Sequence, residues 1–413
     1  MSVLPRRVAI LVFLAFAFAY FFSALVRAIT ATLAPTLTQE FALNARDLGL
    51  LAGGYFLGFA AIQLPLGRLL DRHGPKKVIL GFLAVAVVGC VAFSFARSFS
   101  SLLAARVLCG VGVSACLMAP LTGYRRWLEP TAQLRANSWM LMTGSLGMVA
   151  STLPVQWLMP VLGWRPLFWG LALLLLVAMA VIAWQVPAWT VAQPAPAADA
   201  ARERDDGYAL VWRNPYFRKM TPIGFFNYGG LVAMQTLWAG PWMVKVAGYT
   251  PLQAAGGLFW INVSMLLTFW TWGLVNPSLV RRGFGTDRLI AWGLPSSFVL
   301  LAILIIANND LGTWTTAVFA LFCMSCTFVS LAQPAVGMAF PSQLAGRALS
   351  AYNLVIFAGV FVVQWGIGLL IDGFKAAGLA EVAAFQAAFG VFMASCIASY
   401  GYFLSAKPHN RDK

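Results

Sequence analysis

Long apolar runs dominate this chain, and short polar segments separate them. Twelve of these runs reach about 20 residues, which is enough for a helix to cross the hydrocarbon core of a bilayer. We therefore predict an all-α membrane protein with twelve transmembrane helices. The predicted spans cover residues 8–35, 48–69, 78–96, 101–124, 136–160, 166–185, 220–243, 252–275, 289–307, 312–338, 348–371 and 383–405.

The longest break in the apolar pattern is QVPAWTVAQPAPAADAARERDDGYALVWRNPYFRK, residues 185–219. Its Pro and Ala runs and its charged cluster are typical of a linker. Six predicted spans lie on each side of it, and a Gln-Trp pair recurs in the fifth span of each half, beginning at Gln156 and at Gln364. We predict two pseudo-symmetric six-helix bundles, over residues 1–185 and 220–413, joined by a cytoplasmic linker over 186–219.

Composition and charge agree with a membrane location and set the orientation. A chain with 61% apolar and 10% charged residues is not a soluble domain. With the N-terminus inside, 21 of the 28 Lys and Arg residues fall on the cytoplasmic side, as the positive-inside rule requires. We predict a multi-pass protein of a bacterial cytoplasmic (inner) membrane with both termini cytoplasmic. Because the basic excess is spread over loops, it implies the lipid bilayer as partner and no nucleic acid.

A polar stripe runs along the first predicted span, where Arg27 is the only charged residue between positions 8 and 37. At 100° per residue, four polar side chains of this span fall within an arc of about 80° on one helix face. They are Tyr20, Ser23, Arg27 and Thr30. A charge that faces lipid costs at least about 2.5 kcal/mol, so we expect this face to line a wet cavity or a protein interior.

The segment GRLLDRHGPKKV, residues 67–78, lies between the second and third predicted spans. It resembles the loop signature of the major facilitator superfamily of transporters, G-x-L-x-D-R-x-G-x-K/R-K/R. The matching residues are Gly67, Leu69, Asp71, Arg72, Gly74, Lys76 and Lys77. The resemblance implies a gating loop that holds the two halves in one state. The alternative, that the loop is only a basic membrane anchor, explains the bases but neither Asp71 nor the glycines.

The same resemblance implies that spans one, four, seven and ten line a central cavity. Arg106 begins RVLCG in span four, which is similar to the R-x-x-Q-G motif of the superfamily with Cys109 in place of Gln. The family pattern ties this Arg to proton coupling or to structural contacts in the cavity. At 100° per residue, the span-seven residues Asn227, Gln235 and Trp238 share one helix side. With the first-span stripe, the substrate-binding candidates are then these three residues, Arg106 and the span-ten residue Gln333.

The stretch LVRAITATLAPTLTQEF, residues 25–41, is similar to the first span of the organic-phosphate and sugar-acid transporters of the superfamily, where an Arg binds the substrate anion. Phosphate-binding members pair it with a second Arg in span seven, and this chain has none there until Lys245. A carboxylate therefore suits Arg27 better. All 13 acidic residues fall outside the predicted spans or at their ends, so a cargo anion is the natural counter-charge.

These features predict a secondary transporter that moves a small organic anion by alternating access, with import favoured and protons as the candidate coupling ion. A proton-driven exporter of drugs or metabolites is the alternative, although it would want a carboxylate within a span. A copper importer is a minor alternative, because the soft ligands Met140 and Met142 project to different faces. We expect a monomer, no cofactor, no metal and no enzymatic activity, since no catalytic Asp pair, HExxH or Ser and His pair lies within the spans.

Overall fold

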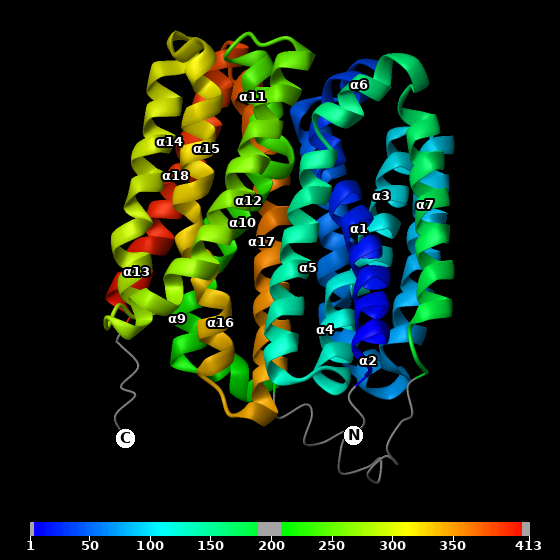
Figure 1. Ribbon diagram of the computed structural model, residues 1–413. Helices are drawn as coiled ribbons and strands as arrows, with labels where there is room; N and C mark the ends of the chain where they lie inside the picture. The colour runs from blue at the N-terminus through cyan, green and yellow to red at the C-terminus, as the bar shows by residue number, and fades with distance from the viewer. Residues whose placement is uncertain (1–3, 189–207, 407–413) are drawn as a thin grey trace.

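The computed structural model describes residues 4–188 and 208–406, and these form helices and no strand (Figure 1). The first half contains α1 (Arg6–Phe41), α2 (Ala45–Phe95), α3 (Phe99–Val113), α4 (Ala115–Trp127), α5 (Pro130–Ala150), α6 (Leu153–Leu162) and α7 (Trp164–Gln185). The second half contains α9 (Pro215–Ile223), η1 (Gly224–Tyr228), α10 (Gly229–Ala233), η2 (Met234–Trp238), α11 (Ala239–Lys245), α12 (Pro251–Arg281), α13 (Thr286–Gly293), α14 (Pro295–Ala307), η3 (Asn308–Trp314), α15 (Thr315–Cys326), η4 (Thr327–Leu331), α16 (Ala332–Met338), α17 (Ser342–Ala376) and α18 (Glu381–Ser405).

The membrane spans are built from these helices in three ways. Ten helical stretches of the described chain are long and apolar enough to cross a bilayer. An eleventh is the pair α5 and α6, which bends by 42° at the break between Ala150 and Leu153. The seventh predicted span is a series of short pieces, α9 to α11, and completes the set of twelve. The prediction of an all-α membrane protein with twelve transmembrane helices is confirmed.

Two places in these spans depart from a regular α-helix. The second and third spans are one helical stretch, α2, interrupted at Gly74, whose φ of 75° is a conformation that glycine adopts without steric cost. In the seventh span, η1 and η2 are π-helical turns. A π-turn inserts one extra residue, so each one rotates the following side chains by about 100° around the helix. The side chains of this span therefore do not follow a regular 3.6-residue repeat.

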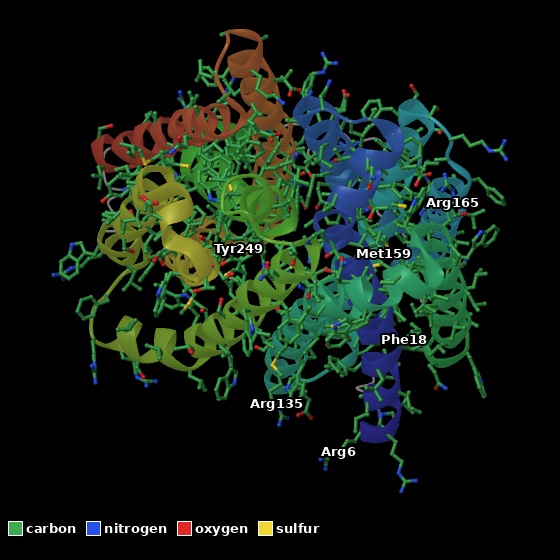
Figure 2. All side chains as sticks on the ribbon, turned by 90° about the horizontal axis from the view of Figure 1, so that it is seen from above. Arg6, Phe18, Arg135, Met159, Arg165 and Tyr249 are labelled. Atoms are coloured by element: carbon green, nitrogen blue, oxygen red, sulfur yellow. The ribbon has the colours of Figure 1, made fainter. Side chains whose placement is uncertain are left out.

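The helices form two groups that lie side by side in Figure 1, α1 to α7 on one side and α9 to α18 on the other. The division is also visible from above in Figure 2, where Met159 and Arg165 lie in one group and Tyr249 in the other. Helix α2 packs along α17, and α5 packs along α12, across the boundary. Helix α1 begins and α18 ends at the same end of the molecule (Figure 1). Most of the predicted linker, residues 189–207, lies outside the described residues.

Candidate functional site

A cavity of about 610 Å³ lies between the two groups of helices. Its first wall comes from α1, α2, α4 and α5, and its second from η1, α16 and α17. Residues near the end that carries the termini, including Arg125 of α4 and Tyr208 before α9, belong to the lining. The cavity thus reaches toward the end of the molecule where α1 begins and α18 ends.

The first-span stripe forms part of the cavity wall. Tyr20, Ser23 and Arg27 all line the cavity. The Nε atom of Arg27 is buried and has no hydrogen-bond partner, and the phenols of Tyr20, Tyr55 and Tyr228 are near enough to interact with the guanidinium electrostatically. Arg27 is therefore a half-buried cation that meets neutral polar groups. The structure places Thr30, the fourth residue of the stripe, in the protein interior with 2% of its surface exposed, outside this lining.

Arg106 contacts the site through the backbone of α1. Its guanidinium donates one hydrogen bond to the carbonyl oxygen of Val26 at 2.7 Å and another to that of Arg27 at 3.0 Å. It also lies over the ring of Tyr55, 4.9 Å from the centroid, and none of its surface is exposed. The direct substrate contact predicted for Arg106 is therefore not what this conformation shows. The long side chain instead holds the helix turn that carries Arg27.

The predicted residues of span seven lie away from the cavity, bonded within the second half. Asn227 donates to the hydroxyl of Ser399 at 2.7 Å, and Gln235 donates to the side chain of Asn262 at 2.9 Å. Trp238 is fully buried, and its Nε1 donates to the carbonyl oxygen of Gln364 at 3.0 Å. The sequence prediction placed these three side chains on one face by assuming 100° per residue. The two π-helical turns break that repeat, which is the physical reason for the discrepancy.

The second wall of the cavity carries a pair of amides. Gln333 of α16 lines the cavity, as the sequence prediction placed it, and its Nε2 donates to the Oδ1 of Asn353 on α17 at 2.6 Å. The sequence analysis missed Asn353, and also Gln63 of α2 and Tyr228 of η1, which line the cavity too. The signal for Gln63 was that it is the one amide of an apolar span, whereas Asn353 is one of two amides in its span, with Gln364. Neither residue was predicted to line the cavity, because the resemblance places spans one, four, seven and ten around it.

The described charged side chains that line the cavity are all basic. Arg27 lies among its lining residues, together with Arg68, Arg125 and Arg347 from α2, α4 and α17. No Asp or Glu belongs to the lining among the residues whose side chains the structure describes. Opposite charges attract across a low-dielectric pocket more strongly than in water. Arg27 would therefore attract an anion that entered the cavity.

The residues of the predicted gating loop lie at the cavity edge and on the surface beside it. Gly67 lines the cavity, while Arg72 and Lys77 are exposed and Lys76 is half-buried. Gly74 supplies the positive φ that separates the second span from the third. The side chain of Asp71 lies outside what the structure describes. The gating role of this loop stays a prediction.

The chain is similar in sequence and fold to known membrane transporters. The family model described as Major Facilitator Superfamily matches residues 16–364. The chain belongs to this superfamily. It is therefore a membrane transporter and not an enzyme. Its fold is also similar to the solved structure of a D-xylose-proton symporter, with a TM-score of 0.79 and 14% identity over 98% of this chain and 99% of the other.

Three curated relatives illustrate the range of functions in this superfamily. The chain is 25% identical to the inner membrane transport protein YajR of Escherichia coli K12, over 87% of this chain and 77% of that protein. It is 28% identical to the 3-(3-hydroxy-phenyl)propionate transporter of the same organism, over 54% of each chain. The multidrug resistance protein MdtL of Escherichia coli O9:H4 is 27% identical over 43% of this chain and 45% of its own length.

Proposed function

We propose that this protein moves a small organic anion, a carboxylate, across the bacterial inner membrane by alternating access between its two halves. The observation that carries the proposal is Arg27. Its Nε has no partner, and no acidic side chain lines the described part of the cavity around it. A guanidinium binds a carboxylate through two parallel hydrogen bonds, which would satisfy the unpaired Nε and neutralise the charge at once.

The body of the cargo would meet a mixed surface. The rings of Phe59 and Phe357, with centroids 4.4 Å apart, both line the cavity from opposite halves. The Gln333 and Asn353 amides add hydrogen-bonding groups on the second wall. A carboxylate with an apolar or aromatic body and one further polar group would use all three features. The relative named for 3-(3-hydroxy-phenyl)propionate supports this choice, because that compound joins a carboxylate, a ring and a hydroxyl.

Direction and coupling are finer parts of the proposal. If both termini are cytoplasmic, as the distribution of Lys and Arg predicts, the cavity opens inward in this conformation. We favour import, with a proton as the candidate coupling ion and a monomer as the working unit. Because no described carboxylate lines the cavity, the proton would travel on the cargo or on a group at the edge of the membrane.

Export of drugs is the second candidate, and the similarity to MdtL is the observation in its favour. Arg27, which lines the cavity with an unpaired Nε, weighs against a cationic drug, because like charges repel. An exporter of anionic metabolites would be compatible with the same lining. The direction of transport is therefore tested separately from the charge of the cargo.

The test is a binding screen on purified protein, followed by uptake into proteoliposomes. We would measure thermal stabilisation by organic carboxylates, including 3-(3-hydroxyphenyl)propionate and 3-phenylpropionate, by sugar phosphates and by cationic dyes. We expect at least one carboxylate to stabilise the protein, Arg27→Gln to abolish that effect, and Arg97→Gln, the same charge change at an exposed position, to leave it intact. Stabilisation by dyes alone, or by carboxylates equally in Arg27→Gln, would contradict the proposal. The rates of uptake and of efflux of the stabilising acid are then compared in proteoliposomes to determine the direction of transport.

A further inference from the structure

At the end of the molecule opposite the termini, helix α2 begins against the last turn of α17 from the other half. The carboxylate of Asp372, on α17, accepts two hydrogen bonds from the backbone of α2. The N–H of Ala45 donates to Oδ1 at 3.2 Å, and the N–H of Arg46 donates to Oδ2 at 2.7 Å. Both bonds cross from one half of the transporter to the other.

The chemistry of a helix start explains this contact. The first backbone N–H groups of a helix have no partner within it, and their dipoles favour a nearby negative charge. In α2 the side chain of Asn44 accepts from the N–H of Asp47 at 2.9 Å, which satisfies one of them from within the same half. The carboxylate of Asp372 accepts hydrogen bonds from the N–H groups of Ala45 and Arg46, which precede Asp47 in the chain. The N-terminal cap of α2 is thus completed only when the two halves are in contact.

Close backbone packing continues along the same pair of helices. A Cβ atom added at Gly49 would overlap with the carbonyl oxygen of Gln364, and one added at Gly368 would overlap with the carbonyl oxygen of Ala45. A little deeper, a Cβ at Gly53 would lie 3.0 Å from the ring of Phe361. At this end, therefore, α2 and α17 meet backbone to backbone, and the contact leaves no room for a side chain.

The same two helices are apart at the other end. Gly67 of α2 and Gly346 of α17 both line the cavity, and a Cβ added at either would meet nothing within 4 Å. The pair is closed at the end that carries Asp372 and open at the end that carries the termini. Alternating access requires this pair to separate where it is now closed.

The ion pairs at the closed end each lie within one half. Arg46 lies 3.5 Å from Asp47, and Glu40 pairs with Arg165, all in the first half. Glu381 lies 3.5 Å from Lys245 and 3.8 Å from Lys375, all in the second half. These pairs do not oppose separation of the halves. Asp372 differs from them because its partners belong to the other half.

We propose that Asp372 is the latch that holds the transporter closed at this end, and that its two bonds to the start of α2 set the balance between the two access states. When the halves separate, the carboxylate and the two N–H groups pass into water. The latch is distinct from the predicted gating loop at residues 67–77, since it lies at the opposite end of the second span and its acid belongs to the second half. Asp372 acts as a positioning residue that touches no cargo.

The experiment measures the separation of the halves directly and needs no substrate. Cysteines introduced at the exposed positions Arg97 and Ala377, one in each half at the latch end, would carry spin labels for distance measurement. A second pair at the exposed positions His73 and Arg282 would report on the opposite end. All six native cysteines are buried, which favours selective labelling of the introduced ones, and the unsubstituted chain gives the background.

Asp372→Ala and Asp372→Asn are compared with Glu381→Gln, which removes a charge at the same end without touching the other half. We expect Asp372→Ala to raise the ratio of the long-distance to the short-distance population at the latch end by roughly tenfold, since hydrogen bonds to an ionised group are the stronger ones. Asp372→Asn, which keeps one acceptor, should give a smaller shift. Distances at the opposite end should shorten in step, and Glu381→Gln should resemble the unsubstituted chain.

Two results would overturn the proposal. One is an unchanged distance distribution in both Asp372 variants, and the other is an equal shift in Glu381→Gln. If Asp372→Ala does not fold, Asp372→Asn alone decides, with Gly49→Ala as an independent way to force the same two helices apart. A shift in Gly49→Ala without one in Asp372→Asn would assign the closure to helix packing and remove the latch.

Discussion

The guanidinium of Arg106 donates a hydrogen bond to the backbone carbonyl of Arg27, so one buried arginine fixes the helix turn that presents another. Both cations lie in the first half of the transporter, and no described acidic side chain forms an ion pair with either of them. Tyr55 reinforces the same turn, since its hydroxyl donates to the carbonyl oxygen of Ser23 at 3.4 Å. The position of Arg27 in the cavity thus depends on two side chains that lie outside the cavity lining.

The variant Arg106→Met tests whether Arg106 positions Arg27 for cargo binding or only stabilises the fold. A fully buried cation without an acidic partner is costly, and replacing such a charge by an apolar side chain of similar size is often neutral or stabilising. We expect the melting temperature to stay the same or rise, while affinity for the cargo anion falls about tenfold, about 1.4 kcal/mol. Thermal unfolding and ligand titration check this. A lower melting temperature with unchanged affinity would make Arg106 a purely structural contact, and Tyr55→Phe is the milder companion variant.

Gly110→Ala tests the packing that holds the first half together. A Cβ at Gly110 would overlap with the carbonyl oxygen of Tyr55, whereas a Cβ at Gly81 would meet nothing within 4 Å. We expect Gly110→Ala to destabilise by about 1 to 3 kcal/mol through overpacking. Gly81→Ala should be neutral or stabilising by up to about 1 kcal/mol, because Ala is the better helix former. Thermal unfolding of both variants in detergent is the measurement, and equal melting temperatures would contradict the prediction.

Asp287→Ala tests an ion pair near the end that carries the termini. Lys219 has only 8% of its side chain exposed and pairs with Asp287 at 2.7 Å, while Tyr216 also donates to this carboxylate. Removing the acid leaves a buried ammonium unpaired. Because Asp287 itself is 38% exposed, we expect a loss of about 1 to 3 kcal/mol, less than for a fully buried pair.

The control for that variant is Asp310→Ala, which removes an exposed acid of the same half. It should leave the melting temperature nearly unchanged. The double variant Lys219→Met with Asp287→Ala should recover most of the loss, because the unpaired charge is then gone as well. A double variant no more stable than Asp287→Ala would show that the pair is not the source of the effect.

Asn353→Ala tests the amide pair as a specificity determinant. Gln333 and Asn353 bond to each other, and both line the cavity opposite Arg27. If they bind a hydroxyl of the cargo, the variant should lose discrimination between 3-(3-hydroxyphenyl)propionate and 3-phenylpropionate, by about tenfold or more, while keeping affinity for the latter. Competition titrations with the two acids measure this ratio. Equal losses for both acids would assign the pair a structural role.

The sequence predicted the fold well because a bilayer leaves few alternatives. Only helices satisfy backbone groups within hydrocarbon at the observed run lengths, so twelve runs predicted twelve spans. Helical periodicity at 100° per residue correctly predicted that Tyr20, Ser23 and Arg27 share one face, because α1 is a regular helix through that stretch. The same argument misplaced Asn227 and Gln235, since π-helical turns come from tertiary packing and leave no mark in the apolar pattern.

Contacts between distant helices could not be predicted from the sequence, for a different reason. Nothing in the local pattern around Asp372 says that it meets the start of α2, more than 320 residues earlier in the chain. Within the second half, Asn353 shares its apolar span with a second amide, Gln364, and only the packing of α16 against α17 gives it a partner in Gln333. The Asp372 contact depends on how the two halves dock, and the Asn353 contact depends on how α16 packs against α17 within the second half. Helical periodicity encodes neither.

The position of Arg27 within a membrane span has an electrical consequence. Arg27 lies within the first span, and no described acid of the lining compensates it. When access switches from one side to the other, the fraction of the membrane potential felt by such a charge changes. Moving one elementary charge across the whole potential changes its electrostatic energy by about 2.3 kcal/mol per 100 mV. The empty carrier and the carrier loaded with a monoanion should therefore respond differently to membrane voltage.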